Sequence, residues 1–504
     1  MDFKANQTIQ KLRGGYYTPN DLAEFIAGWI SNGEETLDAL EPSCGDGNFL
    51  EAFSKTVSSE NSIKITGIEL DPDEAILASK RVSNFNNIQT KIINDDFLSW
   101  GLKTYNNKKF DAVVGNPPFI RYQFLPDKYQ EESKKIFDLF NLKFTKHTNA
   151  WVPFVVLSFE LLKSGGKLGM ILPSEIMHVS HAQSLRTYLG KNASRLLILD
   201  PKELWFKDTL QGALILLAEK KQNKNDTSHG LGIKEVQKRS FVKSNPAKHF
   251  ESVNFINGDT IKGKWTKAVL SKKELDLVKE IQSHKNVYSF SEIANVDVGI
   301  VTGANNFFLV NQSTVKKYSL EEYAYPMFGR SNHCPKIIYD NEQHKRNVES
   351  GLPSNFLYFD VANETEMHEK AREYIQLGEA QNLHERYKCR IRSPWFKVPS
   401  IYSTEIGMLK RSHKFPRLIL NTQQAFTTDT AYRISVTKKA IKNCQLVFSF
   451  LNSFTALSAE LEGRFYGGGV LELIPSEIEK LKIPIVDVNE EELCTLDREF
   501  RSLN

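Results

Sequence analysis

The sequence has few cysteines, and none are spaced in a way that would bind a metal or cross-link the chain. The five cysteines are Cys44, Cys334, Cys389, Cys444 and Cys494. Because they are odd in number, scattered and without Cys-x-x-Cys spacing, they imply neither a zinc site nor a disulfide framework. We therefore expect no metal centre. We also expect Cys44 to be a small packed residue, since no histidine flanks it to activate the thiol.

Long apolar runs are also missing. No window approaches 18 continuous apolar residues, and the opening Met-Asp-Phe-Lys lacks the hydrophobic core of a signal peptide. These absences predict a soluble, cytoplasmic protein with no membrane partner. With 504 residues, of which 40% are hydrophobic, the chain is long enough to build two sizeable cores.

A large excess of charge of one sign is absent as well, because the formal net charge is only +4. The charge is nevertheless uneven across the polar stretch 219–230, which is the best candidate linker. Residues 1–220 hold 25 Lys and Arg against 27 Asp and Glu, and the remaining residues hold 40 against 34. We expect a first domain at 1–220 and a more basic second domain at 221–504, which suits a polyanion. The excess is modest, and on charge alone a solvated surface is the better explanation.

What the chain does contain is most informative at Asn116-Pro117-Pro118-Phe119, which follows the apolar run Phe110–Gly115. The run is short, partly β-branched and bounded by glycine and proline, so it predicts a buried strand that opens into a loop. Ligands bind at such strand ends in α/β sheets. The two prolines stiffen the loop and leave mainly carbonyl acceptors. Asn116 adds an amide oxygen, and Phe119 adds a flat apolar face.

This loop suits a planar exocyclic amine that must be made nucleophilic. Hydrogen bonds from the amine to the Asn116 side-chain oxygen and the Pro117 carbonyl would pull the nitrogen toward sp³ geometry and turn its lone pair to a methyl donor. An ordinary surface turn is the alternative, because Asn-Pro often opens turns.

Segments upstream predict a cofactor site. A strand-like run at 36–40 enters a glycine loop, and a helix at about 49–57 follows it, with its N-terminus directed at a ligand. A second strand at 63–69 ends in Glu69, 22 residues past Gly47, where an acid is placed to bind ribose hydroxyls. A third strand at 90–94 leads to Asp96, which suits an adenine amine, and to Phe97, which suits stacking. The candidate cofactor residues in these segments are Glu41, Ser43, Gly45, Gly47, Glu69, Asp96 and Phe97.

Together these motifs resemble the adenine-N6-specific DNA methyltransferases of bacterial restriction–modification systems, which use S-adenosyl-L-methionine (AdoMet). The tetrapeptide has the NPPF form of their catalytic motif, and Gly14-Gly-Tyr-Tyr-Thr-Pro19 precedes the glycine loop as in the gamma arrangement. The resemblance implies that Tyr16 and Thr18 help bind the methionine end of AdoMet. Thr18 as a helix N-cap is an equally good interpretation. The glycine pattern departs from GxGxxG, which favours AdoMet over a dinucleotide because AdoMet has no pyrophosphate to cradle.

Helices alternate with strands up to the run at 213–218, so we expect one doubly wound α/β domain. The resemblance implies that its sheet is the Rossmann-like mixed sheet of AdoMet-dependent methyltransferases. The resemblance implies an aromatic residue just before that last strand, where it stacks on a flipped target base together with Phe119. Phe206 is our choice and Trp205 the competitor. Simple core packing of the pair is the alternative.

The second half is expected to be an α+β target-recognition domain. Its Thr-Gly-Ala-Asn segment at 302–305 resembles the opening of the recognition domain in gamma-type enzymes, and a TaqI-like C-terminal domain is part of that resemblance. Basic and aromatic residues interleave at 390–397 and 461–469, which suits phosphate contacts and base readout. Ordinary loops with Trp395 packed inward are the alternative. The candidate DNA-binding residues are Thr302, Asn305, Arg390, Arg392, Arg464 and Tyr466.

We therefore predict a site-specific enzyme that methylates the N6 amine of a flipped adenine in double-stranded DNA. No Asp…Glu-x-Lys nuclease cluster is evident, so we expect a separate restriction endonuclease to be the functional partner. RNA guanine-N2 and protein-glutamine methyltransferases also carry Asn-Pro-Pro motifs, but they are usually shorter. A DNA-binding specificity subunit is a further alternative, although the apparently complete cofactor set argues against it.

Overall fold

The computed structural model describes residues 17–57, 62–203, 205, 212–256, 263–466 and 469–502. The chain divides into two compact units, one formed by Met1–Asp276 with Phe465–Gly468 and the other by Leu277–Arg464 with Gly469–Asn504. Within the described ranges, no helix is both long enough and apolar enough to cross a membrane.

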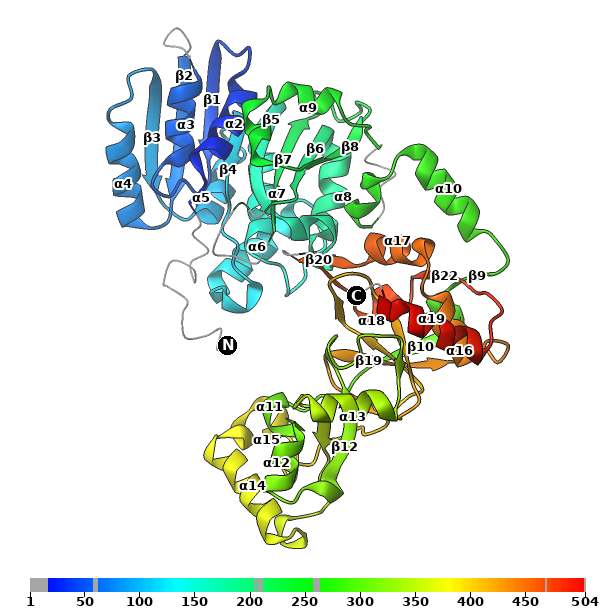
Figure 1. Cartoon of the computed structure of the whole chain (residues 1–504). Coiled ribbons are helices and arrows are strands. Elements are labelled where there is room, and N and C mark those ends of the chain that lie inside the picture. Colours follow the sequence, from blue (N-terminus) through cyan, green and yellow to red (C-terminus); the bar gives the residue numbers. More distant parts are fainter. Residues whose placement is uncertain are drawn as a thin grey trace. The chain divides into compact units, whose positions relative to one another are not determined.

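The first unit is built on an eight-stranded sheet with the order β3-β2-β1-β4-β5-β7-β6-β8 (Figure 1). Strands β1 to β5 run parallel, and β7 runs antiparallel to both of its neighbours. The bounds are β1 (Thr36–Glu41), β2 (Ser62–Glu69), β3 (Ile88–Asn94), β4 (Phe110–Gly115), β5 (Leu162–Pro173), β6 (Ala193–Pro201), β7 (Ala213–Lys220) and β8 (Gly230–Val236). The predicted Rossmann-like mixed α/β sheet is confirmed.

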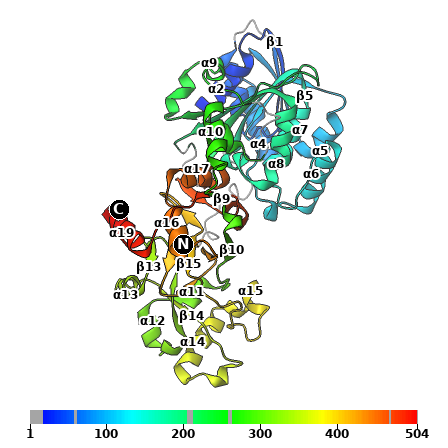
Figure 2. The ribbon, with the colours of Figure 1, turned by 90° about the vertical axis from the view of Figure 1, so that its right-hand side faces the viewer.

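Helices cover both faces of this sheet, as Figure 2 shows. On one face lie α5 (Phe97–Thr104), α6 (Asp127–Leu139), α7 (Trp151–Glu160) and α8 (Gln183–Asn192), and on the other lie α2 (Asn20–Ser31), α3 (Asn48–Thr56), α4 (Pro72–Val82) and α9 (Ala247–Glu251). Successive residues of β4 alternate between the two cores, with Val113 in the first and Val114 in the second. Because both faces are buried, the strand is a continuous apolar run.

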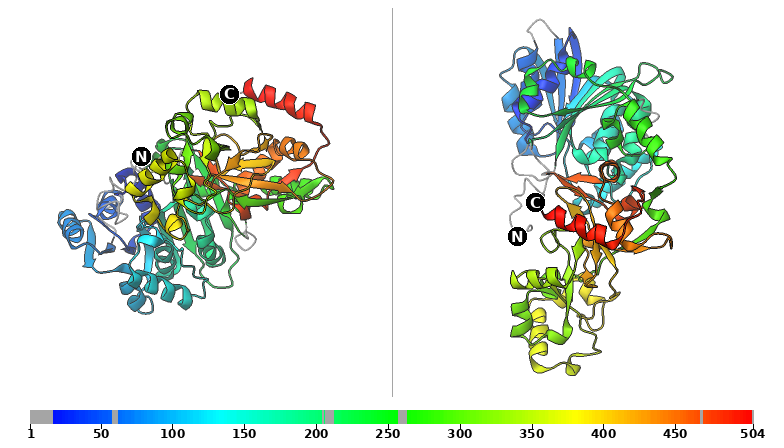
Figure 3. Two further views of the ribbon diagram at one scale, coloured as in Figure 1. Left: turned by 90° about the horizontal axis from the view of Figure 1, so that it is seen from below. Right: turned by 45° about the vertical axis from the view of Figure 1, so that its right-hand side comes forward.

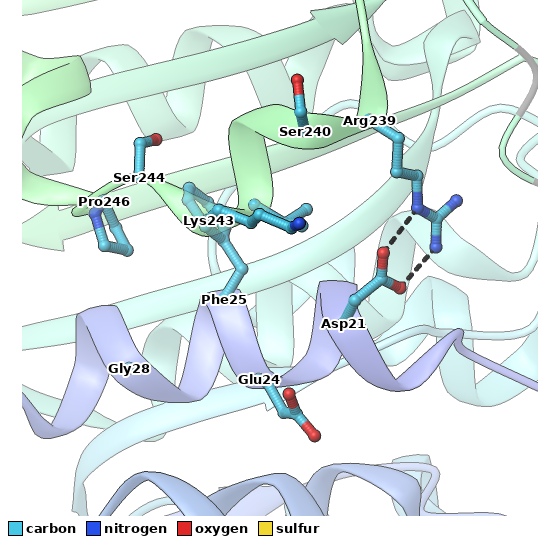
Figure 4. Close-up of a pocket in the computed structure, with 10 residues that line it drawn as sticks. Asp21, Glu24, Phe25, Gly28, Arg239, Ser240, Lys243, Ser244 and Pro246 are labelled. Carbon is cyan, nitrogen blue, oxygen red and sulfur yellow. Dashed lines mark hydrogen bonds and ion pairs between the residues drawn. The ribbon is translucent and has the colours of Figure 1, made fainter.

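The first unit extends beyond Lys220. The polar stretch 219–230 ends β7 and connects it to β8, which pairs in parallel with β6. Farther on, Arg239 donates two hydrogen bonds of 2.6 and 2.7 Å to Asp21 of α2, and this contact lowers the pKa of Asp21 (Figure 4). Trp265 is buried in the same core as α7 and α8. Packing against the sheet therefore continues well past the polar stretch.

The second unit has an α+β architecture. A five-stranded sheet, β10-β19-β15-β17-β13, is accompanied by a four-stranded sheet, β11-β14-β12-β18, and smaller sheets. The C-terminal helix, α19, is red in Figure 3. The strands of the second unit are β9 (Val287–Ser289), β10 (Ala294–Val298), β11 (Leu309–Val310), β12 (Ala324–Phe328), β13 (Ile338–Tyr339), β14 (Asn355–Leu357), β15 (Ile406–Leu409), β16 (Arg411–Ser412), β17 (Leu418–Asn421), β18 (Phe426–Thr427), β19 (Ala431–Val436), β21 (Val470–Glu472) and β22 (Lys482–Pro484). Strand β20 (Arg464–Tyr466) begins in this unit at Arg464, and its other two residues are counted with the first unit.

Short helices connect these strands. They are α11 (Asn305–Phe308), α12 (Gln312–Lys317), α13 (Asn341–Glu349), α14 (Glu369–Ala380), α15 (Tyr387–Arg390), α16 (Asn443–Ser449), α17 (Ser453–Glu462), α18 (Pro475–Ile478) and α19 (Glu490–Ser502), and α10 (Lys272–Gln282) precedes them. A core of aromatic residues joins α11, α14 and the segment around Trp395, whose indole N–H donates to Glu379 at 3.1 Å. Trp395 therefore packs inward, as the alternative interpretation of that segment expected.

Candidate functional site

The predicted cofactor and catalytic motifs meet at one edge of the first sheet. Because β1 to β4 are parallel, their carboxyl ends share this edge, and the strand order reverses between β1 and β4. Such a switch point is where open α/β sheets bind ligands. Glu41, Glu69, Asn94 and Gly115 are the last residues of these four strands.

The glycine loop is bonded directly to the acid that ends β2. Gly45 and Gly47 have φ angles of +52° and +95°, which favour glycine. The N–H of Gly45 donates to Oε2 of Glu69 at 2.8 Å, and the N–H of Asp71 donates to Oε1 of the same carboxylate at 2.8 Å. Glu69 thus links the loop after β1 to the turn after β2. Its contact with a ribose stays a prediction.

Several carboxyl groups cluster around this loop. Glu41 is 2% exposed, and its Oε2 has no hydrogen-bond partner among the described residues. Burial, followed by the charges of Glu69 and Asp46, raises the pKa of Glu41 well above its usual value. Burial also raises the pKa of Glu69, against the lowering effect of its two N–H donors. An unpartnered buried acceptor among acids fits a cationic ligand, and AdoMet carries an ammonium and a sulfonium.

The Thr-Pro segment lies against the glycine loop. Thr18 is buried, and its carbonyl accepts from Asn48 Nδ2 at 3.0 Å. The helix α2 begins at Asn20 with Pro19 at the N-cap position and no side-chain capping bond. Thr18 therefore does not cap the helix, and the capping interpretation was wrong. Tyr16 lies outside the described residues.

The segment after β3 begins the helix α5. Asp96 caps α5 and accepts from the Ser99 N–H at 2.8 Å. Phe97 is 2% exposed and packs against Phe154 with ring centroids 4.9 Å apart, so its ring lies in the core. A stacking role for Phe97 stays a prediction, and this packing does not support it. The thiol of Cys44 is buried, and burial raises its pKa, which agrees with a packed residue.

The loop that we predict to be catalytic leaves β4 beside the glycine loop. The hydroxyl of Ser43 donates to the carbonyl of Asn116 at 3.2 Å, so the two loops are in direct contact. A Cβ on Gly115 would lie 3.3 Å from Cδ of Pro42, which shows how closely the end of β4 packs against the glycine loop. Pro117 is buried, Pro118 is partly exposed, and Phe119 packs against both cores of the first unit. The structure therefore brings the NPPF motif to the predicted cofactor site.

The aromatic pair before β7 is described only in part. Trp205 is buried and stacks on Phe241, with ring centroids 5.7 Å apart. Trp205 is therefore a core residue. Phe206 lies outside the described residues.

Several of the predicted DNA-binding residues hold loops of the second unit together. Thr302 is fully buried and its hydroxyl donates to Oδ1 of Asn305, whose amide donates to Asp429 at 3.0 Å. Arg392 donates to the carbonyls of Val301 at 2.6 Å and Thr302 at 2.8 Å. These contacts position the Thr-Gly-Ala-Asn loop, and the DNA-binding role of the three residues stays a prediction.

The remaining three recognition residues differ in exposure. Arg464 pairs with the buried carboxylate of Glu477 at 2.9 Å. Arg390 is exposed, with its guanidinium 5.7 Å from the centre of the Tyr387 ring. For Tyr466 only the backbone is described, as the last residue of β20.

A cavity in the second unit joins two of the segments singled out in the sequence. It has a volume of about 570 Å³ and is lined by Val301, Tyr358, Lys388, Ile391, Arg392, Ser393, Lys397, Val398, Pro399, Ser400 and Ile401. Arg392 holds the Val301 side of this cavity through its bonds to the Val301 and Thr302 carbonyls. Arg433 holds the Ser400 side by donating to the carbonyls of Val298 at 2.7 Å and Ser400 at 2.9 Å. The sequence analysis did not single out Lys388 or Ile391, because Lys388 lies just before the basic and aromatic run 390–397 and Ile391 is an apolar residue within it.

A second cavity, of about 590 Å³, lies in the first unit between α2 and the turn at Arg239–Lys243 (Figure 4). Asp21, Phe25 and Arg239 line it, and none of the motif residues does. No group of three or more potential metal ligands occurs in the described part of the chain.

The first unit has the features of an AdoMet-dependent methyltransferase. These are the strand order with β7 as its reversed strand, the glycine loop, and the second strand that ends in an acid. A family model described as N-6 DNA Methylase matches residues 3–309, more than half of the 504 residues. The chain belongs to the N-6 DNA methylase family. It is a DNA adenine methyltransferase with AdoMet as its cofactor, and the RNA and protein methyltransferase alternatives are not favoured.

Other comparisons extend the likeness into the second half. A model of the C-terminal domain of the type II methyltransferase M.Eco57I matches residues 262–504. The type II methyltransferase M.AccI of Acinetobacter calcoaceticus is 26% identical over 509 residues, which cover 97% of this chain and 89% of the relative. M.BanIII of Aneurinibacillus aneurinilyticus is 28% identical over 272 residues, which cover 49% of this chain and 44% of the relative.

Among solved structures, a cryo-EM structure of a DrdV–DNA complex has a TM-score of 0.52 to this chain at 12% identity. The match covers 98% of this chain and 57% of the other, so this chain spans a little over half of that neighbour. At this identity the likeness supports the fold alone.

Proposed function

We propose that this chain is the modification enzyme of a type II restriction–modification system, with the gamma order of motifs and a C-terminal recognition domain of TaqI-like role. It would transfer a methyl group to the N6 amine of an adenine flipped out of double-stranded DNA, in the cytoplasm, and protect that DNA from a separate endonuclease. The contact between the glycine loop and the catalytic loop, Ser43 to Asn116, is the observation that carries the proposal. M.AccI, which matches nearly the whole chain, is named as a type II methyltransferase.

The catalytic step follows from the acceptors of the loop. When bound, AdoMet supplies an electrophilic methyl group. The Asn116 side-chain oxygen and the Pro117 carbonyl would accept the two hydrogens of the adenine amine, which localises the lone pair on the nitrogen. Pro118 keeps the loop stiff, and Phe119 supports the flipped ring with Phe206. Acceptors fixed in this way stabilise the positive charge that develops on the amine.

The cofactor would be held by the residues around the glycine loop. We assign the carboxylate of Glu41, whose Oε2 has no partner among the described residues, to the ammonium group, Glu69 to the ribose and Asp96 to the adenine amine. Gly45 and Gly47 allow the backbone to approach, and we assign Ser43, Tyr16 and Thr18 to the methionine end.

A direct test offers AdoMet with a tritiated methyl group to DNA, RNA and protein. We expect label in DNA alone, and long-read sequencing of DNA from expressing cells should show N6-methyladenine at one recurring site. Label in RNA or protein without label in DNA would overturn the proposal.

Replacing Glu69 with alanine should weaken AdoMet binding by at least tenfold while DNA affinity is largely kept. Two hydrogen bonds to a charged group contribute about 1.5–3 kcal/mol each, and the variant also removes the acceptor that holds the Gly45 N–H. The Glu69→Gln variant keeps an acceptor oxygen and should lose less. Calorimetry with AdoMet provides the measurement, and an unchanged dissociation constant for Glu69→Ala would assign the residue to structure.

The cavity beside α15 is our candidate for a DNA phosphate contact in the second unit. Its described lining includes three cationic side chains and no carboxylate, and Lys388 is exposed beside the apolar Ile391. Lys397 is paired with Asp360 at 3.0 Å and Arg392 is engaged with backbone, so Lys388 is the cation we assign to phosphate. Gly303, at φ +80°, lets its loop pack closely against Lys388, because an added Cβ would lie 2.7 Å from Cβ of Lys388.

Lys388→Gln should weaken DNA binding about five- to tenfold at 0.1 M salt and reduce the slope of log affinity against log salt by about one. The matched control is Lys345→Gln on α13, an exposed lysine that does not line the cavity. Titration of labelled duplex at several salt concentrations gives both values. Equal slopes for the two variants would remove Lys388 from the interface.

A further inference from the structure

The catalytic loop is held at two backbone points just after Phe119. The N–H of Ala150 donates to the carbonyl of Ile120 at 3.0 Å. The N–H of Tyr122, where the short helix Tyr122–Phe124 begins, donates to Oδ1 of Asn149 at 3.3 Å. Both partners stand immediately before α7, so the start of that helix fixes the far end of the loop.

Asn149 also reaches the end of the neighbouring strand. Its Nδ2 donates to Oε2 of Glu175 at 3.2 Å, and its side chain is largely buried at 8% exposure. Glu175 lies in the turn Ser174–Met177 that directly follows β5, the strand paired with β4. One amide therefore connects the loop after β4 to the turn after β5.

The residue type at position 149 matters because both the oxygen and the nitrogen of the side-chain amide form hydrogen bonds. An asparagine amide offers an acceptor to the Tyr122 N–H and a donor to the Glu175 carboxylate at once. Neither an aspartate nor an alanine supplies this pair. The interaction has a charged acceptor, which makes it stronger than a bond between neutral groups.

We propose that Asn149 and Glu175 form a clamp that sets the position of the catalytic loop, which makes Asn149 a positioning residue for methyl transfer. The inference rests on the assignment of Asn116 and Phe119 to catalysis. Neither clamp residue is expected to touch the adenine. A shift of about 1 Å in a reacting group can cost roughly 10²-fold in rate, so loss of the clamp should act on the rate of transfer and leave AdoMet binding intact.

The test exchanges the two polar groups. Asn149→Asp places a carboxylate against Glu175, and the single-turnover rate of DNA methylation should fall about 10- to 100-fold. Glu175→Gln alone leaves an acceptor oxygen for Asn149 and should change the rate less than about threefold. The double variant Asn149→Asp/Glu175→Gln restores one donor and one acceptor in reversed order, and it should recover most of the wild-type rate.

The control is Asn87→Asp, at a partly buried asparagine that donates to Ser54 and Val57 far from the strand ends that carry the site. It should lower the melting temperature without slowing transfer. AdoMet affinity should be unchanged in every variant.

Two results would overturn the clamp: a normal rate for Asn149→Asp, or a double variant as slow as that single variant. If Asn149→Asp fails to fold, the rate of the double variant decides: a near-wild-type rate supports the clamp, and a rate about 10- to 100-fold below wild type overturns it. If the wild-type enzyme itself transfers no methyl group to DNA, the proposed function fails instead.

Discussion

Asn116→Ala is expected to fold and bind AdoMet normally but to methylate DNA about 10²- to 10³-fold more slowly, which is the usual cost of losing one preorganised acceptor in a transition state. The contact that Ser43 makes with this residue goes to its backbone carbonyl, so the alanine variant keeps that link between the loops. The measurement is the single-turnover rate with saturating AdoMet and DNA.

The conservative variant separates acceptor chemistry from packing. Asn116→Asp retains a side-chain oxygen at the same position and should transfer faster than Asn116→Ala. If alanine gives a near-normal rate, or if aspartate and alanine are equally slow at unchanged cofactor and DNA affinity, the side-chain oxygen is not the acceptor of the adenine amine.

Much of the first sheet could be predicted because its strands carry their own boundaries. Glycine and two prolines end β4 at Gly115, and the acid that closes β2 stands where the run of apolar residues stops. Once such strands are parallel, their carboxyl ends must share an edge. The convergence of Glu41, Glu69 and Asn116 on one site therefore follows from local sequence signals together with the topology.

The features that sequence reasoning missed depend on partners that are distant in the chain. Nothing local to the polar stretch 219–230 shows that β8 pairs with β6 beyond it. In the same way, Arg392 was expected at DNA because basic and aromatic residues interleave around it, and nothing local shows that it donates two hydrogen bonds to carbonyls about 90 residues away. Asn149 precedes an apolar helix without any motif, and only the folded contacts single it out.

The second large effect concerns the division of labour between the two units. An adenine inside a duplex cannot reach a pocket at Asn116, so the base must be flipped out at a cost of a few kcal/mol. In our proposal, contacts from the more basic second half offset that cost, together with stacking on Phe119 and Phe206. The prediction is that residues 1–276 alone bind AdoMet yet methylate the recognition site at least about 10³-fold less efficiently, which is the lower end of the gap between specific and non-specific DNA binding.

The boundary for this experiment belongs at Asp276, because a cut at 220 would remove β8 and the buried Trp265 from the first unit. Calorimetry shows first that the fragment is folded and binds AdoMet, and tritium transfer to duplex DNA then gives its activity. Full-length protein should brighten 2-aminopurine placed at the target adenine, and the fragment should not. Phe206→Ala in the full chain should slow transfer to duplex DNA more than it weakens AdoMet binding. A fragment that methylates the same sites as the whole protein at a similar rate would mean that recognition and flipping reside in the first unit, contrary to the division proposed here.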